Sequence, residues 1–418
     1  KFHHFLVVRY EVNQKGSYIR SLSDYKKMVK LNSLFLPLPL LFLFLFLSPS
    51  SAHNKTQKAS SSSLHNSYQG SFSMVYAFGD SYTDTGNAHF LGGLAPFAGS
   101  TNSPYGSTTN TTMNRLSNGR LVVDFLCEAL SIPHLPPYQD TSSNFTHGVN
   151  FAVAGSTALP SDFFANSSLL HTLMWKNAPL SLQNQTDWFN KFVQGVACKG
   201  KDAQSCKADM EKALFWIGEM GVNDYARAFG SSFSPQMLTE MAVGHASKLL
   251  KTLLDAGAKY IVVNGLPPMG CLSSGISLSP LPQFDKMGCS LIANSRIMLH
   301  NALLQGKLER FRTRYPDCKI VYADYWNAYL NILMNRSKYQ FQEPFKACCG
   351  GGGGLLNFNL TSLCGSPGTS TCKDPSKYMN WDGVHLTEAT HGVLADLFLN
   401  QGFCRPSFSE LIKNKSGI

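Results

Sequence analysis

A serine that directly follows an apolar, strand-like run is the feature that most constrains how this chain folds. Residues 74–78 are apolar, and the polar, glycine-containing run 79–87 follows them at once, with Ser81 near its start. Far along the chain, Asp382 and His385 stand close together ahead of a helix-like segment. A serine becomes nucleophilic when a histidine takes its proton and a carboxylate orients that histidine. The pattern therefore predicts a fold that brings these three side chains into one cleft.

Apolar runs alternate with helix-period segments along most of the chain. The predicted strands are 74–78, 213–217, 260–263 and 320–322, and the predicted helices are 236–256 and 285–315. Strands separated by long helices need parallel crossover connections, so the alternation predicts an α/β domain with three layers around a central parallel sheet. Ligands of such sheets bind beyond the C-terminal strand ends. The polar runs at 79–87, 218–224 and 264–265 each follow a predicted strand, so we expect them to share that edge.

Four sequence blocks resemble those of the plant GDSL esterase/lipase family, which belongs to the SGNH hydrolase superfamily. They read Gly-Asp-Ser-Tyr-Thr-Asp-Thr-Gly-Asn at 79–87, Asn-Phe-Ala-Val-Ala-Gly at 150–155, Gly-Glu-Met-Gly-Val-Asn-Asp at 218–224 and Asp-Gly-Val-His at 382–385. The resemblance covers residues 72–404, and only Tyr82 replaces the leucine of the family name, a common variation in plants. It implies a flavodoxin-like three-layer α/β/α SGNH hydrolase fold. The chain has no Gly-x-Ser-x-Gly sequence, which argues against the α/β-hydrolase fold.

The resemblance also implies a role for five residues. Ser81 is the nucleophile, His385 the base and Asp382 the acid that orients it. The backbone N–H of Gly155 and the side-chain amide of Asn223 join the N–H of Ser81 in an oxyanion hole, where fixed donors stabilise the negative charge that forms on the carbonyl oxygen. From the residues alone, Gly155 is better explained as a turn glycine, and Asn223 fits a turn or capping role equally well.

The implied activity is hydrolysis of a carboxylic ester of a lipid or plant metabolite through an acyl-Ser81 intermediate, with no metal or organic cofactor. An acyltransferase that passes the same acyl group to a second alcohol is the first alternative. A catalytically silent protein that binds cell wall or lipid is the second, and the intact Ser81, Asn223 and His385 argue against it. An apolar stretch after Gly155 either lines an acyl pocket or packs in the core; it comprises Phe163, Phe164, Leu169, Leu170 and Trp175.

Residues 28–52 have the pattern of a secretory signal peptide. An apolar run at 34–47 follows three lysines and precedes Ser-Ser-Ala at 50–52. The run is too short and too interrupted by proline for a membrane span; a retained signal anchor is the alternative. Residues 1–27 are expected to be an upstream extension or a gene-model artefact, because Met28 stands where an ordinary leader would start. The expected mature parts are a Ser-rich flexible segment (53–73), a single hydrolase domain (74–404) and a C-terminal tail (405–418).

All eleven cysteines lie after the expected leader, which suits an oxidising compartment. The close pairs Cys198/Cys206 and Cys271/Cys289 are expected to be local loop staples. A group of four (Cys348, Cys349, Cys364 and Cys372) would brace the loop ahead of His385; a zinc site is the alternative, although no Cys-x-x-Cys pair occurs there. Cys127 and Cys318 lie in apolar segments and are candidate free thiols. Without these two, the number of cysteines is still odd, so the sequence does not determine the disulfide pairing.

The charge and the glycosylation signals bear on partners and location. Residues 1–52 hold seven Lys/Arg and two acidic residues, so the net charge of 53–418 is +5 rather than +10. These charges are scattered, which argues against a nucleic acid partner. A small-molecule or lipid ester is the expected partner, a monomer is the favoured state, and no transmembrane span is expected. The leader predicts secretion to the apoplast, cell wall or vacuole, with candidate N-glycosylation at Asn54, Asn110, Asn144, Asn166, Asn184, Asn335, Asn359 and Asn414.

Overall fold

A computed structural model of the chain describes residues 68–92, 103–108, 114–166, 179–229, 231–279 and 283–416. Every element below belongs to the unit Lys58–Ile418. The expected upstream extension and signal peptide lie outside the described residues. Within the described ranges, no helix combines the length and the hydrophobicity that crossing a bilayer requires.

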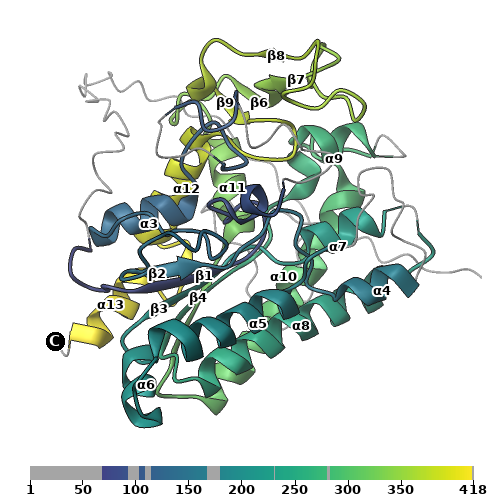
Figure 1. Cartoon of the computed structure of the whole chain (residues 1–418). Coiled ribbons are helices and arrows are strands. Elements are labelled where there is room, and N and C mark those ends of the chain that lie inside the picture. Colours follow the sequence, from purple (N-terminus) through teal and green to yellow (C-terminus); the bar gives the residue numbers. More distant parts are fainter. Residues whose placement is uncertain are drawn as a thin grey trace, which may run out of the picture. The chain divides into compact units, whose positions relative to one another are not determined.

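A six-stranded sheet forms the centre of this unit, in the order β10-β5-β4-β3-β1-β2 (Figure 1). Its strands are β1 (Val75–Phe78), β2 (Gly148–Asn150), β3 (Leu214–Ile217), β4 (Tyr260–Asn264), β5 (Lys319–Ala323) and β10 (Cys404–Arg405). The first five pair in parallel, and β10 adds an antiparallel edge. The order 2-1-3-4-5 is that of flavodoxin-like sheets, in which ligands bind where the strand order reverses, beyond β1 and β3. All four predicted strands are confirmed.

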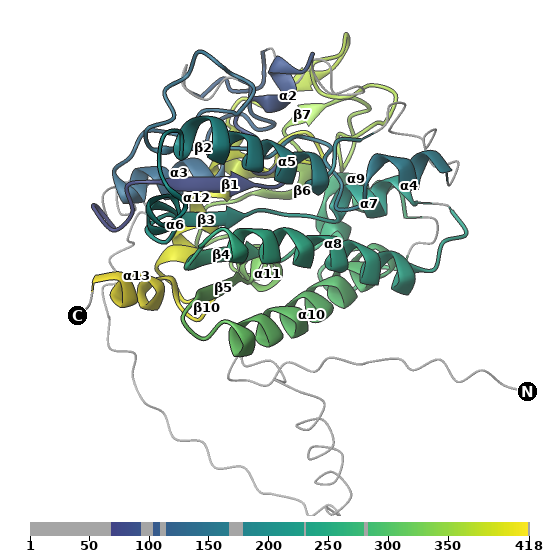
Figure 2. The same cartoon turned by 60° about the horizontal axis from the view of Figure 1, so that its bottom comes forward.

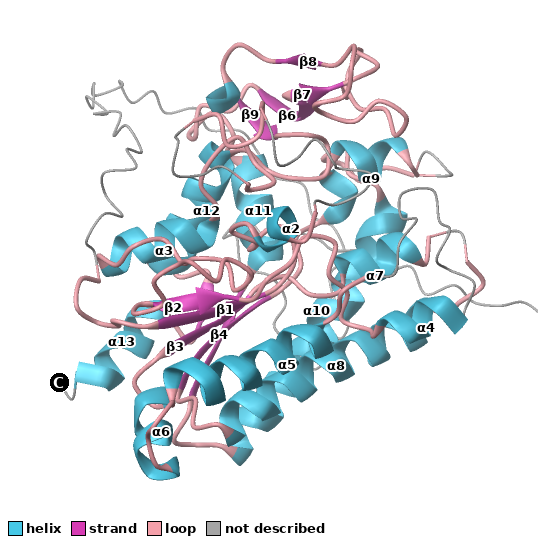
Figure 3. Cartoon of the chain, in the orientation of Figure 1, coloured by secondary structure: helices cyan, strands magenta, loops and turns pink. Residues whose placement is uncertain are grey.

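Helices cover both faces of the sheet (Figure 2, Figure 3). One face packs through Ala77, Trp216 and Val262 against α3 (Val122–Leu130), α11 (Tyr325–Met334), α12 (Glu388–Leu399) and α13 (Phe408–Ser416). The other packs through Phe78, Phe215 and Val263 against α5 (Leu182–Phe192), α8 (Pro235–Asp255) and α10 (Leu291–Arg314). Successive strand residues point to opposite faces, so a strand covered on both sides is apolar at every position, as Leu-Phe-Trp-Ile of β3 is. The predicted three-layer α/β fold is confirmed.

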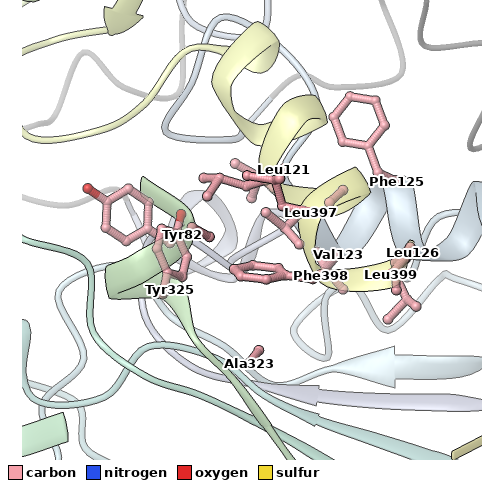
Figure 4. Packing of buried hydrophobic residues seen from close by; sticks show 14 of the residues in the cluster. Tyr82, Leu121, Val123, Phe125, Leu126, Ala323, Tyr325, Leu397, Phe398 and Leu399 are labelled. Atoms are coloured by element: carbon pink, nitrogen blue, oxygen red, sulfur yellow. The ribbon is translucent and has the colours of Figure 1, made fainter. Parts of the chain in front are cut away.

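The segment after β1 is anchored in the first of these cores by an aromatic side chain. Tyr82 is 3% exposed, and its ring centroid lies 6.1 Å from that of Tyr325 on α11. Figure 4 shows Tyr82 beside Tyr325, near Phe398 of α12. Fully burying a large apolar side chain contributes about 1.5–3 kcal/mol. The packing of this ring therefore fixes the polar run against two helices that come from the far end of the sequence.

The helix predicted at 236–256 is α8. The Ser234 side chain accepts a hydrogen bond from the N–H of Met237 at its start. Gly257 adopts φ +108° at its end, where a residue with a Cβ would be strained.

The helix predicted at 285–315 begins later than expected, at Leu291. The Asp285 side chain accepts hydrogen bonds from the N–H groups of Met287 and Cys289 and closes a turn instead. Ser290 then caps the helix by accepting from the N–H of Ala293. Local hydrogen bonds by Asp and Ser favour turns and N-caps over the helix interior, which explains the shift.

Short elements fill the connections. They are helices α2 (Asn87–Phe90), α4 (Ser161–Asn166), α6 (Ala203–Met210), α7 (Val222–Arg227) and α9 (Ser273–Ser277), a π-helical turn (Val193–Ala197), 3-10 turns (Met269–Cys271 and Pro375–Lys377), and strands β6 (Glu343–Ala347), β7 (Cys349–Gly350), β8 (Ser370–Thr371) and β9 (Tyr378–Asn380). Two small sheets, β6 with β9 and β7 with β8, lie together at the top of Figure 1. They form the structure that immediately precedes residues 382–385.

Eight of the eleven cysteines form disulfides. The pairs are Cys198–Cys206, Cys271–Cys289, Cys348–Cys372 and Cys349–Cys364. The first two are the predicted staples, and the other two use all four cysteines of the predicted brace, so none of these remains as a zinc ligand. Cys127 and Cys318 are free as expected, and buried Cys404 is the third free thiol that makes the count odd.

The eight candidate glycosylation sites differ in what the structure says of them. Asn144, Asn335 and Asn359 are exposed. The half-buried Asn184 uses its side-chain oxygen to accept from the N–H of Ser181 at the start of α5. The other four sites, or their side chains, lie outside the described residues: Asn54, Asn110, Asn166 and Asn414.

Candidate active site

The fold brings Ser81, His385 and Asp382 into one hydrogen-bonded chain. The Oγ atom of Ser81 lies 2.9 Å from Nε2 of His385, and Nδ1 of that ring lies 2.7 Å from Oδ2 of Asp382. All three side chains are at least nine-tenths buried, with Ser81 the most exposed at 7%. Ser81 follows β1, which places it beyond the carboxyl end of the sheet at the point where the strand order reverses.

The short spacing of the acid and the base is explained by the turn between them. Oδ1 of Asp382 accepts hydrogen bonds from the N–H groups of Val384 and His385, at 2.9 and 2.7 Å. Gly383 has φ +89°, and a Cβ there would lie 2.4 Å from the ring of Phe358. One carboxylate thus closes the backbone turn with one oxygen and holds the imidazole with the other.

A tyrosine that the sequence did not single out completes the surroundings of this carboxylate. The hydroxyl of Tyr105 donates to Oδ2 of Asp382 at 2.7 Å. Burial acts to raise the pKa of Asp382, but His385 and the hydrogen bonds to the carboxylate hold it below its ordinary value. The acid is therefore ionised at neutral pH. Because Tyr105 lies far from every block in sequence, no local pattern pointed to it.

Tyr82 links the serine segment to the histidine turn. Its hydroxyl donates to the backbone oxygen of Val384 at 2.7 Å. Leucine, which stands here in the family name, has no donor for this contact. Tyrosine in place of leucine at position 82 therefore adds a hydrogen bond between the segment that carries Ser81 and the turn that carries His385.

The three expected oxyanion donors differ in whether their N–H groups are already hydrogen-bonded within the protein. Gly155 has φ +76° in a turn, which favours glycine. Among the described residues, no acceptor is hydrogen-bonded to the backbone N–H of Ser81 or of Gly155. The amide of Asn223, on α7, donates to the backbone oxygen of Ser156 at 2.9 Å and more weakly to Oδ2 of Asp80 at 3.3 Å.

Two buried carboxylates hold the loop that carries Gly155. Asp84 accepts from the N–H of Ala154 at 2.8 Å and from three N–H groups at the start of α2. Asp224 accepts from the N–H groups of Ala158 and Leu159 at 2.8 and 2.9 Å. The loop is thus fixed at both ends, by one acid from the block at 79–87 and one from the block at 218–224. These two residues of the sequence blocks therefore have a structural role.

A second pair of buried acids, Asp80 and Glu219, adjoins the segment that carries Ser81. Burial and the neighbouring Glu219 raise the pKa of Asp80 well above its ordinary value, and burial raises the pKa of Glu219 to about 7. Oε2 of Glu219 accepts from the hydroxyl of Thr83 at 3.1 Å. The sequence analysis did not identify this pair.

A mostly apolar pocket opens between the expected oxyanion amide and the histidine turn. Asn223 lines it on one side and Val384 on the other, with α7, α9 and α10 supplying most of the wall. Of the two roles left open for the apolar stretch after Gly155, core packing holds for two residues: Phe164 is fully buried in a core cluster and Phe163 packs against that cluster. Leu169, Leu170 and Trp175 lie outside the described residues.

Comparisons with known proteins agree with this site. A family model described as GDSL-like lipase/acylhydrolase matches residues 75–398. One GDSL esterase/lipase of Arabidopsis thaliana is 43% identical over 352 residues, which cover 82% of this chain and 90% of that protein. Another from the same plant is 37% identical over 358 residues, covering 81% and 93%. Acetylajmalan esterase 2 of Rauvolfia serpentina is 34% identical over 323 residues, covering 77% and 87%. The chain therefore belongs to the family of GDSL-like lipases and acylhydrolases and is a serine carboxylic ester hydrolase.

Proposed function

We propose that the chain cleaves its ester through an acyl intermediate on Ser81. His385 takes the proton from Oγ through Nε2 while Oγ attacks the carbonyl carbon, and it then gives that proton to the leaving alcohol. Water next attacks the carbonyl carbon of the acyl-serine while His385 takes its proton. The bond from the acyl carbon to Oγ then breaks, His385 gives the proton to Oγ, and the free acid leaves. The Oγ to Nε2 distance of 2.9 Å is the observation that carries this proposal.

The oxyanion would be held by the donors that surround Ser81. The unengaged N–H groups of Ser81 and Gly155 supply two, and Asn223 supplies the third by exchanging its 3.3 Å contact with Asp80 for the substrate oxygen. Loss of one such donor typically costs about 10²–10³ in turnover. The stronger bond of Asn223 to Ser156 keeps the amide oriented during the exchange.

The pocket supports a substrate with an apolar part. Its lining includes Val222, Phe229, Met269, Leu278 and Ile297, so an acyl chain or an apolar alcohol placed there would leave water. An ester of a lipid or of a plant metabolite fits this description. Residues 74–404 would act as a single hydrolase domain, since one sheet runs from β1 to β10; Arg405 of β10 and the packed helix α13 lie beyond residue 404 and would belong to the same domain.

We also infer that the chain passes through the secretory pathway to the apoplast, cell wall or vacuole. Four disulfides, together with exposed Asn144, Asn335 and Asn359 in glycosylation signals, support this location. They complement the leader pattern at 28–52.

The test uses protein collected from the medium of a plant cell culture that expresses the chain. We expect hydrolysis of p-nitrophenyl esters from acetate to palmitate, with the turnover of Ser81→Ala lower by about 10⁴-fold or more. A fluorophosphonate probe should label the wild type and not the variant. Equal activity of the two proteins would refute the serine mechanism, and ester formation from an added alcohol in place of hydrolysis would favour the acyltransferase. Retention of the chain inside the cells would contradict secretion.

A further inference from the structure

The pocket beside the active site contains one cation in its wall. The lining comprises Val222, Asn223, Tyr225, Ala226, Phe229, Met269, Ser274, Gly275, Leu278, Ser279, Ser290, Ile292, Ala293, Arg296, Ile297 and Val384. Of these residues only Arg296 is charged. It stands on the second turn of α10, with Ile292, Ala293 and Ile297 as neighbours on the same helix.

Arg296 differs from Arg115 and Arg120, which are also removed from water, in having no acid to pair with among the described residues. Arg115 is bound to Asp124 at 2.7 Å, and Arg120 reaches Glu388 at 2.6 Å. No carboxylate of the described residues lies within ion-pair distance of Arg296, although its side chain is half-buried. A guanidinium partly removed from water is costly unless an anion or hydrogen-bond acceptor faces it.

The position of this side chain connects it with the chemistry. The same pocket is lined by Asn223, the proposed oxyanion donor, and by Val384, which directly precedes the proposed base. Helix α9 is tied to the catalytic turn, since the N–H of Ser274 donates to the backbone oxygen of Gly383 at 2.9 Å. A substrate part that occupies the pocket would therefore extend from the reacting carbonyl towards Arg296.

We propose that Arg296 binds a carboxylate carried by the ester substrate, so that the preferred substrates are esters with an apolar spacer and an acidic end. This inference rests on the proposed function of the Ser81 site. The planar guanidinium can form two parallel hydrogen bonds with a carboxylate, and such charge-assisted bonds are roughly twice as strong as neutral ones. The carboxylate can belong to the acyl part, as in a half-ester of a dicarboxylic acid, or to the alcohol.

Two pairs of esters distinguish these sources. On the acyl side, the mono-p-nitrophenyl esters of adipate, suberate and sebacate are compared with neutral p-nitrophenyl esters of matching length. On the alcohol side, 4-acetoxybenzoate is compared with 4-methylphenyl acetate. Each kcat/KM is divided by that of the variant Arg296→Met on the same ester, which cancels the intrinsic reactivity of the ester.

We expect the loss in Arg296→Met to be at least about tenfold greater on the acidic ester than on its neutral partner in one of the two pairs. Arg296→Lys should retain part of the preference, because it keeps the charge without the bidentate geometry. Arg310→Met is the matched control: it removes an exposed charge about 21 Å further along the same helix and should leave the preference intact.

The outcomes distinguish failure of the proposed serine mechanism from failure of the proposed carboxylate site at Arg296. If Ser81→Ala abolishes hydrolysis of the neutral esters but Arg296→Met acts equally on both members of each pair, the serine mechanism stands and the carboxylate site is refuted. If Arg310→Met reduces the preference as much as Arg296→Met does, the effect comes from net charge and the site is also refuted. A preference on the acyl pair alone, or on the alcohol pair alone, supports the site and assigns the carboxylate to that part of the substrate.

Discussion

Single residues at this site serve two purposes at once. Asp382 closes its own turn with one oxygen and orients His385 with the other. Tyr82 fills a core position with its ring and joins the histidine turn with its hydroxyl. Each of these side chains therefore supports the fold and also positions the reacting groups. A substitution at either position should lower activity by disturbing both.

Tyr105→Phe should lower kcat/KM by about 10- to 100-fold. The substitution removes the hydroxyl that donates to Oδ2 of Asp382 but keeps the ring, and a hydrogen bond to a charged group is worth about 1.5–3 kcal/mol. The rate of labelling of Ser81 by a fluorophosphonate should fall in parallel.

Tyr138→Phe provides the control for this change. Tyr138 stacks on Trp188 away from the triad, and its ring is also retained in the variant. It should label at the wild-type rate. If Tyr105→Phe also labels at the wild-type rate, its hydroxyl contributes nothing to the reactivity of the serine.

Among the elements, the two small sheets come directly before the turn that contains Asp382 and His385. The N–H of Cys348 donates to the backbone oxygen of Asn380 at 3.0 Å, and that of Cys349 to the oxygen of Trp381 at 2.7 Å. Both cysteines are in disulfides, and Asp382 is the next residue after Trp381. The brace that the sequence predicted is thus bonded directly to the backbone beside Asp382, the proposed acid.

The double variant Cys349→Ala/Cys364→Ala should lose activity at temperatures where the helices remain folded. Closing this loop stabilises the fold by about 3 kcal/mol in the chain-entropy model. Loss of the brace should free the backbone at Trp381 before the main sheet unfolds. Ester hydrolysis would report the loss of activity, and far-ultraviolet circular dichroism on the same heating series would report the unfolding of the helices.

Cys198→Ala/Cys206→Ala is the matched double variant. Its loop, near α6, lies at the opposite end of the molecule from β7 and β8 in Figure 1 and is worth about 2.5 kcal/mol by the same model. Its activity and helical signal should disappear together. A common midpoint for both signals in Cys349→Ala/Cys364→Ala would contradict a specific role for the brace.

For the whole molecule, local patterns predicted the sheet and the meeting of Ser81, His385 and Asp382 but not the residues that support them. β3 could be predicted because every position is apolar, and Ser81, Asp382 and His385 because nucleophilic catalysis needs those side chains. Tyr105 contacts Asp382, and Arg296 lines the pocket beside Asn223 and Val384, so both meet segments that are distant in sequence. Their positions depend on how distant loops and helices pack together, which cannot be predicted from a period or a spacing along the chain.

Buried ionisable groups give the molecule a stability that depends on pH. The folded pKa of Glu219, about 7, exceeds its ordinary value of 4.5 because the side chain is buried. The protonated acid therefore favours the folded state: its contribution is complete below pH 4.5 and is lost as the pH rises to about 7. His300 and His391 have the opposite effect, since burial lowers the pKa of each to about 3 and stability is lost as the pH falls below 6.5.

The variant Glu219→Gln removes the contribution of this acid while the histidines stay common to both proteins; the pKa of Asp80, which Glu219 helps to raise, falls with it. Glutamine keeps the size and one acceptor oxygen for the hydroxyl of Thr83, but it cannot ionise. The free energy of unfolding from urea titrations should therefore rise in the variant relative to the wild type as the pH goes from 4.5 to 8, by on the order of 3 kcal/mol. A difference between the two proteins that stays constant over this range would mean that Glu219 titrates normally in the folded chain. The carboxyl of Glu219 would then be in contact with water, contrary to its burial in the structure.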